Sequence, residues 1–396
     1  MQPNKKIFLY MSSGLHTAYK SMIANCPEGF EFAASDYMAH GAITASRDVS
    51  PGLGSFTKNL ITKVQPYVSS SYNHLHILLN KPKVRKFVSS DYDLIHSGQS
   101  LLDTNLPYVV DFEHAAVFSG YNQYAFRRKG FVRALEKTLL NPKLKKLLAW
   151  SDAAGKSLTN FVNNEEVKAK VETVYPVFSL GKKIKRTQKE FGFLFIGGNF
   201  YEKGGYETIL AFEKIMDKYD CKLTMIGTIP LELAQKYLNH PKITLVGRVP
   251  YEKVVEYYSN SDAFVFPTHY DTYGFVVPEA LSFGLPVIST TSFSMPELVE
   301  NEKTGLLINT YFSSFAPDAG YALGTLDELY PKRIEICKNP PEWYITSLAN
   351  AMERLIIDNS LRNELSKNAE LVAKEGKFSP KSWRDKMKRI YTEALE

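Results

Sequence analysis

One stretch, residues 262–291, constrains the fold of this chain more than any other; it reads DAFVFPTHYDTYGFVVPEALSFGLPVISTT. Residues 263–266 are an apolar run ended by a proline, which predicts a buried strand. After a polar loop, the Pro-Glu pair at 278–279 predicts the start of a helix, because proline is favoured in a first helical turn. A glycine and a proline then end that helix before a second predicted strand at 287–289. Such a strand–loop–helix–strand unit is typical of a parallel α/β sheet.

Two carboxylates border this predicted helix start, Asp271 in the loop and Glu279 in the first turn. Their spacing can place them on either side of backbone N–H groups at a helix N-terminus, where phosphate binds. A phosphate between two hydroxyl-accepting carboxylates would suit a sugar nucleotide. The pattern also fits an ordinary strand–turn–helix unit whose acids are solvated, and this stretch alone leaves both interpretations open.

Predicted strands alternate with helix-length segments along the rest of the chain, which favours parallel sheets covered on both faces. The further predicted strands are 6–10, 75–79, 94–96, 108–112, 147–150 and 171–175 in the first half, and 193–196, 222–226 and 243–246 in the second. The polar and basic segment 176–190 is the predicted linker. A length of 396 residues suits two domains at ~100–200 residues each. Segment 309–339 is a less regular insertion to which the sequence assigns no role.

The cysteines and the hydropathy exclude several classes of protein. Cys26, Cys221 and Cys337 are isolated from one another, so neither a disulfide framework nor a metal cluster is predicted. The sequence offers no His/Cys/Asp set with metal-ligand spacing. No run approaches the ~18 apolar residues of a spanning helix, and the first residues do not resemble a secretory signal. We therefore expect a cytoplasmic protein.

Positive charge is concentrated in the first half of the chain. Residues 1–185 contain 24 Lys and Arg against 14 Asp and Glu, whereas residues 186–396 contain 24 against 28. The densest basic stretch, 127–146, is interleaved with apolar residues and could lie on an anionic membrane surface or hold an acidic partner. A solvated helix face explains such a run equally well. Nucleic-acid binding is not expected, because the recognition motifs of such modules are missing from the sequence.

A second loop of interest follows the strand at 193–196 and reads GGNFYEKGG over residues 197–205. Gly197 and Gly198 would let backbone N–H groups approach a diphosphate, and Lys203 would add a positive charge. The loop matches neither GxxxxGK[ST] nor GxGxxG, and a glycine-capped turn is the simpler alternative.

Four further residues are candidates because they follow or end predicted strands. His114 and His96 lie at carboxyl ends of strands, the edge at which α/β sheets bind ligands. His269 precedes Asp271 and could merely line its loop, and Arg248 is a cation that could face the same crevice. An isolated histidine is more often a satisfied core or loop residue than a ligand contact.

With both loops considered together, the chain resembles the large retaining glycosyltransferase family numbered four, whose members have the GT-B fold. That family has a Glu-x7-Glu pattern before a Gly-x-Pro turn, and here Asp271 and Glu279 precede Gly284-Leu-Pro286. The family's Gly-Arg…Lys-Gly loop corresponds to GGNFYEKG at 197–204. The resemblance covers about residues 190–310 specifically, is weaker at 379–395 and is loose in the N-terminal half.

The resemblance implies a fold of two Rossmann-like α/β domains facing each other across a deep cleft. Residues 1–178 would bind the acceptor and residues 186–378 the nucleotide sugar, while a last helix within 379–396 would cross back to the first domain. Two departures are visible. Asp271 stands where the family has Glu, and Gly198 stands where the family has an arginine, for which Arg248 could compensate.

Roles for individual residues also follow from the resemblance. Glu279 would accept hydrogen bonds from the ribose hydroxyls and Asp271 from the transferred sugar, which His114 would also contact. The diphosphate would be held by Lys203 and by backbone amides of the helix start, which are those of Gly274, Phe275, Val276 and Val277. Gly14 would belong to a loop that closes over the phosphates.

The predicted function is therefore transfer of a sugar, with retained configuration, from a nucleotide-diphosphate donor to an acceptor hydroxyl. The resemblance implies no metal, no cofactor and no protein nucleophile, because the departing phosphate oxygen takes the acceptor's proton. We expect a glycan or glycolipid acceptor and a cytoplasmic protein, with peripheral binding to the inner face of the membrane through 127–146. The alternatives are another GT-B enzyme, such as a nucleotide-sugar epimerase or a phosphorylase, and a non-catalytic protein that binds nucleotide sugars.

Overall fold

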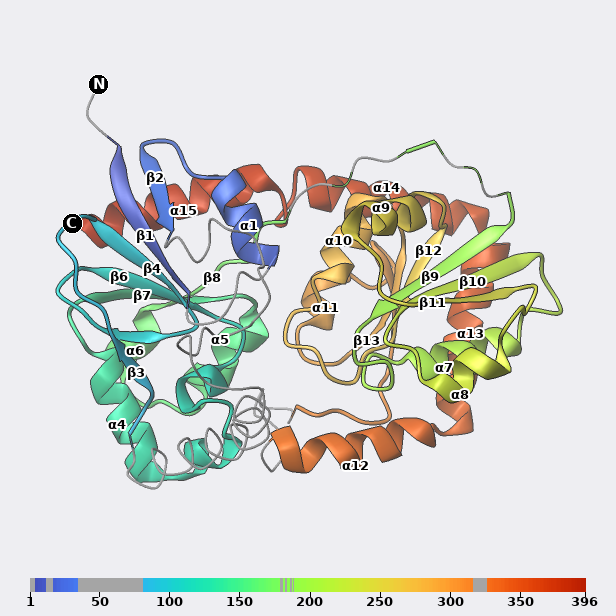
Figure 1. Cartoon of the computed structure of the whole chain (residues 1–396), viewed down its shortest axis with the longest axis horizontal. Helices are drawn as coiled ribbons and strands as arrows, with labels where there is room; N and C mark the ends of the chain where they lie inside the picture. The colour runs from blue at the N-terminus through green and yellow to red at the C-terminus, as the bar shows by residue number, and fades with distance from the viewer. Residues whose placement is uncertain are drawn as a thin grey trace, which may run out of the picture.

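The computed structural model describes residues 4–11, 17–34, 81–178, 181, 184–185, 187, 189–315 and 326–396. The main elements form two parallel sheets flanked by helices, which lie side by side as two bodies in Figure 1. The predicted strand at 75–79 and the loop that contains Gly14 lie outside the described residues.

The N-terminal domain is built on a six-stranded sheet in the order β2-β1-β4-β6-β7-β8, and all its strand pairs are parallel. Its strands are β1 Lys5–Met11, β2 Phe30–Ala34, β4 Leu94–Gly98, β6 Tyr108–Phe112, β7 Leu144–Ala149 and β8 Val171–Thr173. A separate pair consists of β3 Val84–Lys86 and β5 Leu101–Asp103. The helices are α1 Thr17–Ala24, η1 Ala115–Ser119, η2 Gln123–Arg127, α4 Lys129–Leu139, α5 Asp152–Thr159 and α6 Glu165–Ala169.

The C-terminal domain has a second parallel sheet of six strands in the order β11-β10-β9-β12-β13-β14. Its strands are β9 Phe191–Gly197, β10 Cys221–Gly227, β11 Ile243–Val246, β12 Ala263–Phe266, β13 Val287–Thr290 and β14 Gly305–Ile308. Its helices are α7 Gly205–Glu213, α8 Leu231–Lys236, α9 Tyr251–Ser259, α10 Val276–Ser282, α11 Met295–Leu298, α12 Leu326–Lys338, α13 Glu342–Ile357 and α14 Asn359–Lys374. The order of strands reverses between β9 and β12, so the loops after these two strands lie at the edge of the sheet where such folds bind ligands.

The predicted α/β architecture is confirmed, and its strands show why it was visible in the sequence. All residues of β6 and β12 are buried, as expected where helices cover both faces of a parallel sheet. Such strands are short, continuous apolar runs that stand out from their surroundings. Residues 30–34 and 84–86 were not predicted as strands; the second pairs only with β5 in a small separate sheet.

Helix α10 begins two residues earlier than predicted, at Val276, so Pro278 is its third residue. Proline is still tolerated there, because the N–H groups of the first helical turn have no partner within the helix. The earlier start follows from Gly274, whose φ of 76° turns the chain directly into the helix.

The last helix, α15 Pro380–Leu395, packs against the N-terminal domain, as Figure 1 shows beside β1 and β2. Ser379 caps its first turn, and its buried residues are Trp383, Met387, Ile390, Tyr391 and Ala394. The Tyr391 hydroxyl lies 2.8 Å from Nδ1 of His96, whose Nε2 lies 3.0 Å from Oδ2 of Asp111. His96 is therefore a satisfied core residue that helps to fasten this helix.

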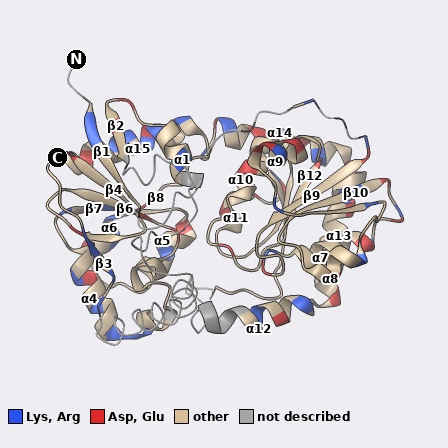
Figure 2. Cartoon of the chain, viewed as in Figure 1, with Lys and Arg blue, Asp and Glu red and all other residues tan. Residues whose placement is uncertain are grey.

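The basic stretch 127–146 does not form one continuous helix but spans the end of η2, all of α4 and the start of β7. The apolar residues of α4 (Phe131, Val132, Leu135 and Leu139) are buried in the domain core, so they are not available to enter a membrane. Figure 2 shows positive charge along α4, and the exposed cations of this stretch are Arg127, Lys129, Arg133, Lys137 and Lys143. In the part of the chain that the structure describes, no helix has both the length and the hydropathy to cross a bilayer.

The packing of α15 predicts a large loss of stability when Tyr391 is removed. Tyr391→Ala should lower the free energy of unfolding by about 3–5 kcal/mol, because it leaves a cavity at a fully buried position. Tyr391→Phe should cost about 1–3 kcal/mol, because it leaves the buried His96 nitrogen without this partner. Urea denaturation measures both values. Leu371→Ala, at an exposed position of α14, is the control, and an equal loss in Tyr391→Ala and Leu371→Ala would contradict the docking of α15.

Candidate functional site

The two loops singled out in the sequence meet at the reversal of strand order in the C-terminal sheet. One loop follows β9 and leads into α7, and the other follows β12 and leads into α10. Because β9 and β12 are neighbours in the sheet, both loops lie at the same carboxyl edge. The predicted site residues Lys203 and Asp271 thus come together although 68 positions separate them.

Lys203 and Asp271 form an ion pair, with Nζ lying 2.7 Å from Oδ2. The ammonium group also donates to the carbonyl of Tyr270 at 2.6 Å, and Oδ1 of Asp271 accepts the N–H of Tyr273 at 3.1 Å. The two charged side chains are only 18% and 16% exposed, so water screens the pair weakly. An ammonium group has three N–H donors, and two are used here. The third can still donate to an anion.

Glycine is required at the end of the first loop. Gly204 has a φ of 80°, and a Cβ at this position would lie 2.4 Å from the carbonyl oxygen of Pro267. The backbone after Lys203 therefore packs directly on the end of β12. This contact holds the lysine loop against the aspartate loop.

Arg248 lies beside the glycine that replaces the family's arginine. A Cβ at Gly198 would be 3.9 Å from a terminal guanidinium nitrogen of Arg248, whose Nε donates to the Thr228 hydroxyl at 3.3 Å. Arg248 is exposed and follows β11, which is separated from β12 by β10 and β9. The tertiary structure thus brings a cation to the place beside Gly197 and Gly198 where the sequence lacks one.

The start of α10 presents backbone amides at the same edge of the sheet. Val277 donates its N–H to the carbonyl of Gly274 at 2.8 Å, which closes the first turn. The amides of Gly274, Phe275 and Val276 precede this bond and lie at the N-terminal end of the helix, the end that attracts anions.

Glu279 points from α10 toward Tyr258 of α9. The Tyr258 hydroxyl donates to its Oε2 at 3.3 Å, and the side chain is half-buried. Burial raises the pKa of Glu279 to about 7, although the hydrogen bond from Tyr258 favours the carboxylate. Glu279 therefore changes its charge near neutral pH. A perturbed carboxyl group at a ligand-binding edge is a candidate for function.

His114 lies at the carboxyl end of β6, as predicted, but it has a structural role there. Its Nδ1 accepts the N–H of Ala116 at 3.0 Å and so caps η1. The ring is buried and packs near Phe293 and Phe315 of the C-terminal domain, at centroid distances of 5.5 and 6.1 Å. His114 therefore contributes to the contact between the domains.

Glu113 is a residue that the sequence analysis missed, and it lies close to the ion pair. Its carboxylate accepts the Thr272 hydroxyl across the domain boundary at 2.8 Å and the Tyr121 hydroxyl at 2.7 Å. The pKa of Glu113 is raised, chiefly because the carboxyl group is buried, and the charge of Asp271 adds to this effect. The two hydroxyl donors and the charge of Lys203 act in the opposite direction. Its position directly after the end of β6, next to His114, could have identified Glu113 as a candidate from the sequence.

Glu297 makes a second contact across the boundary. Its two carboxylate oxygens accept the N–H groups of Asp152 and Ala153 at 2.7 and 2.8 Å, so a residue of α11 caps the first turn of α5. Burial raises the pKa of Glu297, while the two backbone N–H bonds lower it. A carboxylate at a helix N-terminus also interacts favourably with the helix dipole. The two domains therefore touch at Glu297 as well as at Glu113.

The insertion at 309–339 contacts the lysine loop through Arg333. Arg333 of α12 is buried and donates from Nε to Oε1 of Glu202 at 2.6 Å. Its guanidinium group also lies 4.2 Å from the ring centroid of Tyr270. Glu202 precedes Lys203, and Tyr270 precedes Asp271. One side chain of the insertion therefore contacts both neighbours of the ion pair.

Part of the chain matches a family of known proteins. Residues 179–316 match the family described as Glycosyl transferases group 1, and the matched part contains Lys203, Asp271 and Glu279. The capsular polysaccharide biosynthesis glycosyltransferase CapM of Staphylococcus aureus is 26% identical over 209 residues, which are 51% of this chain and 46% of CapM. The chain spans less than half the length of the first curated relatives that it matches.

Solved structures are similar over nearly the whole chain. Anabaena HepE in complex with UDP has a TM-score of 0.60 at 14% identity, covering 98% of this chain and 99% of HepE. Sucrose-phosphate synthase from Thermosynechococcus elongatus has a TM-score of 0.57 at 18% identity, covering 98% of both chains. At such identities the likeness shows the fold alone. Residues 179–316 therefore match the Glycosyl transferases group 1 family, and the chain as a whole has the GT-B fold.

Proposed function

We propose that this protein is a retaining glycosyltransferase of the family numbered four, which transfers a sugar from a nucleotide-diphosphate donor to an acceptor hydroxyl. The observation that carries the proposal is the ion pair of Lys203 and Asp271 at the carboxyl edge of β9 and β12. With it, a cation, a hydroxyl acceptor and a helix start lie at one edge of the sheet. Each of these groups matches one part of a nucleotide sugar.

Departure of the nucleotide diphosphate is the difficult step, because negative charge builds up on the leaving oxygen. Lys203 would stabilise that charge with its third N–H, together with the amides of Gly274, Phe275 and Val276. Arg248, beside Gly198, would add a second cation. Oriented donors of this kind stabilise charge better in a crevice than in water, because they are held in place before the reaction. Transfer would then need no metal at the phosphates.

The carboxylates would recognise hydroxyl groups of the donor. Glu279 would accept the ribose hydroxyls, and Asp271 those of the transferred sugar, as in the family pattern. Glu113 lies across the domain boundary from Asp271, hydrogen-bonded to Thr272. It would therefore face the sugar from the acceptor side, next to His114.

The relatives suggest the class of donor and acceptor. HepE was crystallised with UDP, and CapM acts in capsular polysaccharide biosynthesis. We therefore propose a uridine diphosphate sugar as the first donor to examine and a surface-glycan precursor as the acceptor.

A panel of nucleotide sugars, assayed for released nucleotide with the purified protein, tests the proposed function. One donor should be consumed, and Lys203→Ala should lower its turnover by about 10²–10³-fold, the usual cost of removing a donor to a developing oxyanion. Lys214→Ala, at an exposed ion pair of the same domain, is the control. Binding without release would indicate a non-catalytic protein, and sugar conversion without release would indicate an epimerase. Unchanged turnover in Lys203→Ala with intact fold would remove the role of Lys203.

The raised pKa of Glu279 predicts how donor affinity depends on pH. Above pH 7 the carboxylate accepts ribose hydroxyls, so the KM for the donor should fall about tenfold between pH 6 and pH 8, following the ionised fraction. Glu279→Gln should raise the KM and remove this dependence. The folded state holds this proton more tightly than the unfolded chain, so the contribution of Glu279 to stability declines as pH rises from about 4.5 to about 7. A pH-independent KM in the unaltered protein would contradict the assignment.

The exposed cations of α4 and its flanks predict salt-sensitive membrane binding without insertion. Because the apolar residues of α4 are buried, only charge can hold the protein on anionic lipid. The protein should sediment with phosphatidylglycerol vesicles at low salt and be released at high salt. The double variant Arg133→Glu, Lys137→Glu should not sediment, whereas phosphatidylcholine vesicles are the control for lipid charge. Failure to bind phosphatidylglycerol vesicles at low salt would refute a membrane site.

A further inference from the structure

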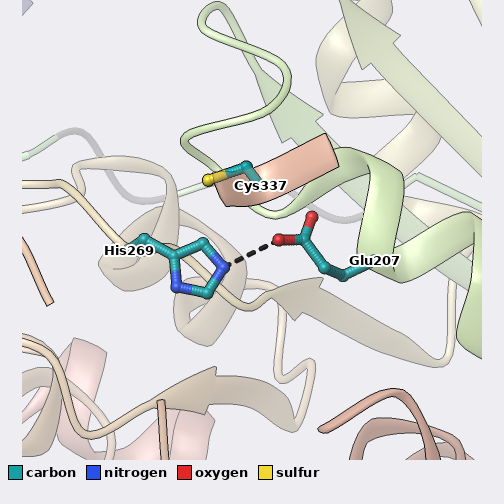
Figure 3. A group of neighbouring side chains, drawn as sticks. All are labelled: Glu207, His269 and Cys337. Carbon is teal, nitrogen blue, oxygen red and sulfur yellow. Dashed lines mark hydrogen bonds and ion pairs between the residues drawn. The ribbon is translucent and has the colours of Figure 1, made fainter. Parts of the chain in front are cut away.

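Three buried side chains with metal-binding chemistry meet beneath the ion pair of the site. They are Glu207 of α7, His269 of the loop after β12 and Cys337 of α12, shown together in Figure 3. All three residues are fully buried, and one possible ligand atom from each lies within 4.8 Å of the other two. Because 62 positions separate Glu207 from His269, no spacing motif could reveal the group.

The hydrogen bonds of His269 determine which ring nitrogen carries a proton. The Thr310 hydroxyl donates to the carbonyl of Phe312, so its oxygen can only accept from Nδ1 of His269 at 3.0 Å. The Phe312 carbonyl, 3.3 Å from Nδ1, is an acceptor as well. Nδ1 therefore carries a hydrogen, and the hydrogen between Nε2 and Oε1 of Glu207 must leave before the Nε2 lone pair can face an ion. A ring N–H donated to a backbone carbonyl is the usual support of a metal-binding histidine.

The carboxylate of Glu207 is only partly satisfied. Its Oε1 lies 2.8 Å from Nε2 of His269 and accepts the Tyr311 hydroxyl at 2.9 Å. Its Oε2 is buried and lacks a hydrogen-bond partner among the described residues. Leaving a buried carboxylate oxygen unpaired costs free energy, so such an atom calls for an explanation.

The donor set indicates the class of ion that would fit. Thiolate, imidazole and carboxylate together bind Zn²⁺, whereas Mg²⁺ and Ca²⁺ prefer oxygen ligands alone. Tetrahedral ligand atoms about 2.0–2.3 Å from zinc lie about 3.3–3.8 Å from one another. The observed separations, from 2.8 Å for the His269–Glu207 pair up to 4.8 Å, bracket this range. One divalent cation would balance the charges of the Cys337 thiolate and the Glu207 carboxylate.

We propose that Glu207, His269 and Cys337 bind one zinc-class divalent cation, with the unpaired Oε2 of Glu207 or a water molecule as the fourth ligand. Binding would release the thiol proton of Cys337 and the proton shared by His269 and Glu207 to solvent. Glu207 follows Lys203 by four positions, and His269 precedes Asp271 by two. The ion would therefore join α12, α7 and the aspartate loop directly behind the residues of the donor site. It would not touch the donor.

Cobalt(II) supplied in place of zinc during expression tests this proposal independently of any enzyme activity. The purified protein should contain equimolar cobalt and show the near-ultraviolet absorption of a thiolate–cobalt bond. Cys337→Ser should lose that absorption. Cys221→Ser, at a buried cysteine of β10 outside the cluster, should retain it. Protein without bound cobalt, or absorption that persists in Cys337→Ser, would overturn the site.

Zinc content and the temperature of thermal unfolding give a second test, which remains valid if Cys337→Ser fails to fold. Protein expressed with added zinc should contain equimolar zinc and unfold at a higher temperature than protein expressed under zinc depletion. Glu207→Gln should reduce this difference, because it replaces a charged ligand by a neutral amide at similar volume. Equal unfolding temperatures and no retained zinc in the unaltered protein would refute the proposal. If the unaltered protein binds zinc but transfers no sugar from any donor, the metal site stands and the proposed function is contradicted.

Discussion

The ion pair between Lys203 and Asp271 joins the carboxyl ends of two strands that are neighbours in the sheet but far apart in the chain. A lysine so poorly exposed needs an opposite charge, because removing a lone ammonium group from water is costly. The pair provides that charge and keeps the ammonium group at the crevice. The glycine turn at Gly204, the packing on Pro267 and the turn at Gly274 all serve to bring these two loops together.

The contacts between the domains depend on the same edge of the sheet. Glu113 holds Thr272, one residue beyond Asp271, and Glu297 caps α5 of the opposite domain. Both carboxyl groups have a raised pKa, because the facing domain removes them from water. Reduced access to water strengthens every charge interaction in the crevice. The meeting of the domains therefore contributes to the chemistry of the site as well as to its shape.

The insertion that includes α12 contacts residues of both site loops, and these contacts indicate its role. Arg333 contacts Glu202 and Tyr270, and Cys337 joins Glu207 and His269 below them. These contacts form a largely buried polar cluster beside the two loops. The hydrogen bonds among these groups restrict their motion, whereas Oε2 of Glu207 and Nη1 of Arg333 lack partners among the described residues. The insertion thus supports both site loops through these contacts.

The sequence alone was sufficient for the α/β class, for most strands and for both site loops, since buried parallel strands and glycine-rich turns leave local patterns. It also indicated Lys203, Asp271 and Glu279 as candidates, because each lies in such a pattern. It could not show that Arg248 stands beside Gly198, that Glu113 approaches Asp271, or that Glu207, His269 and Cys337 meet. These contacts join residues from separate strands, helices or domains. Only tertiary packing creates them, because no local propensity records which distant side chain will fill a given space.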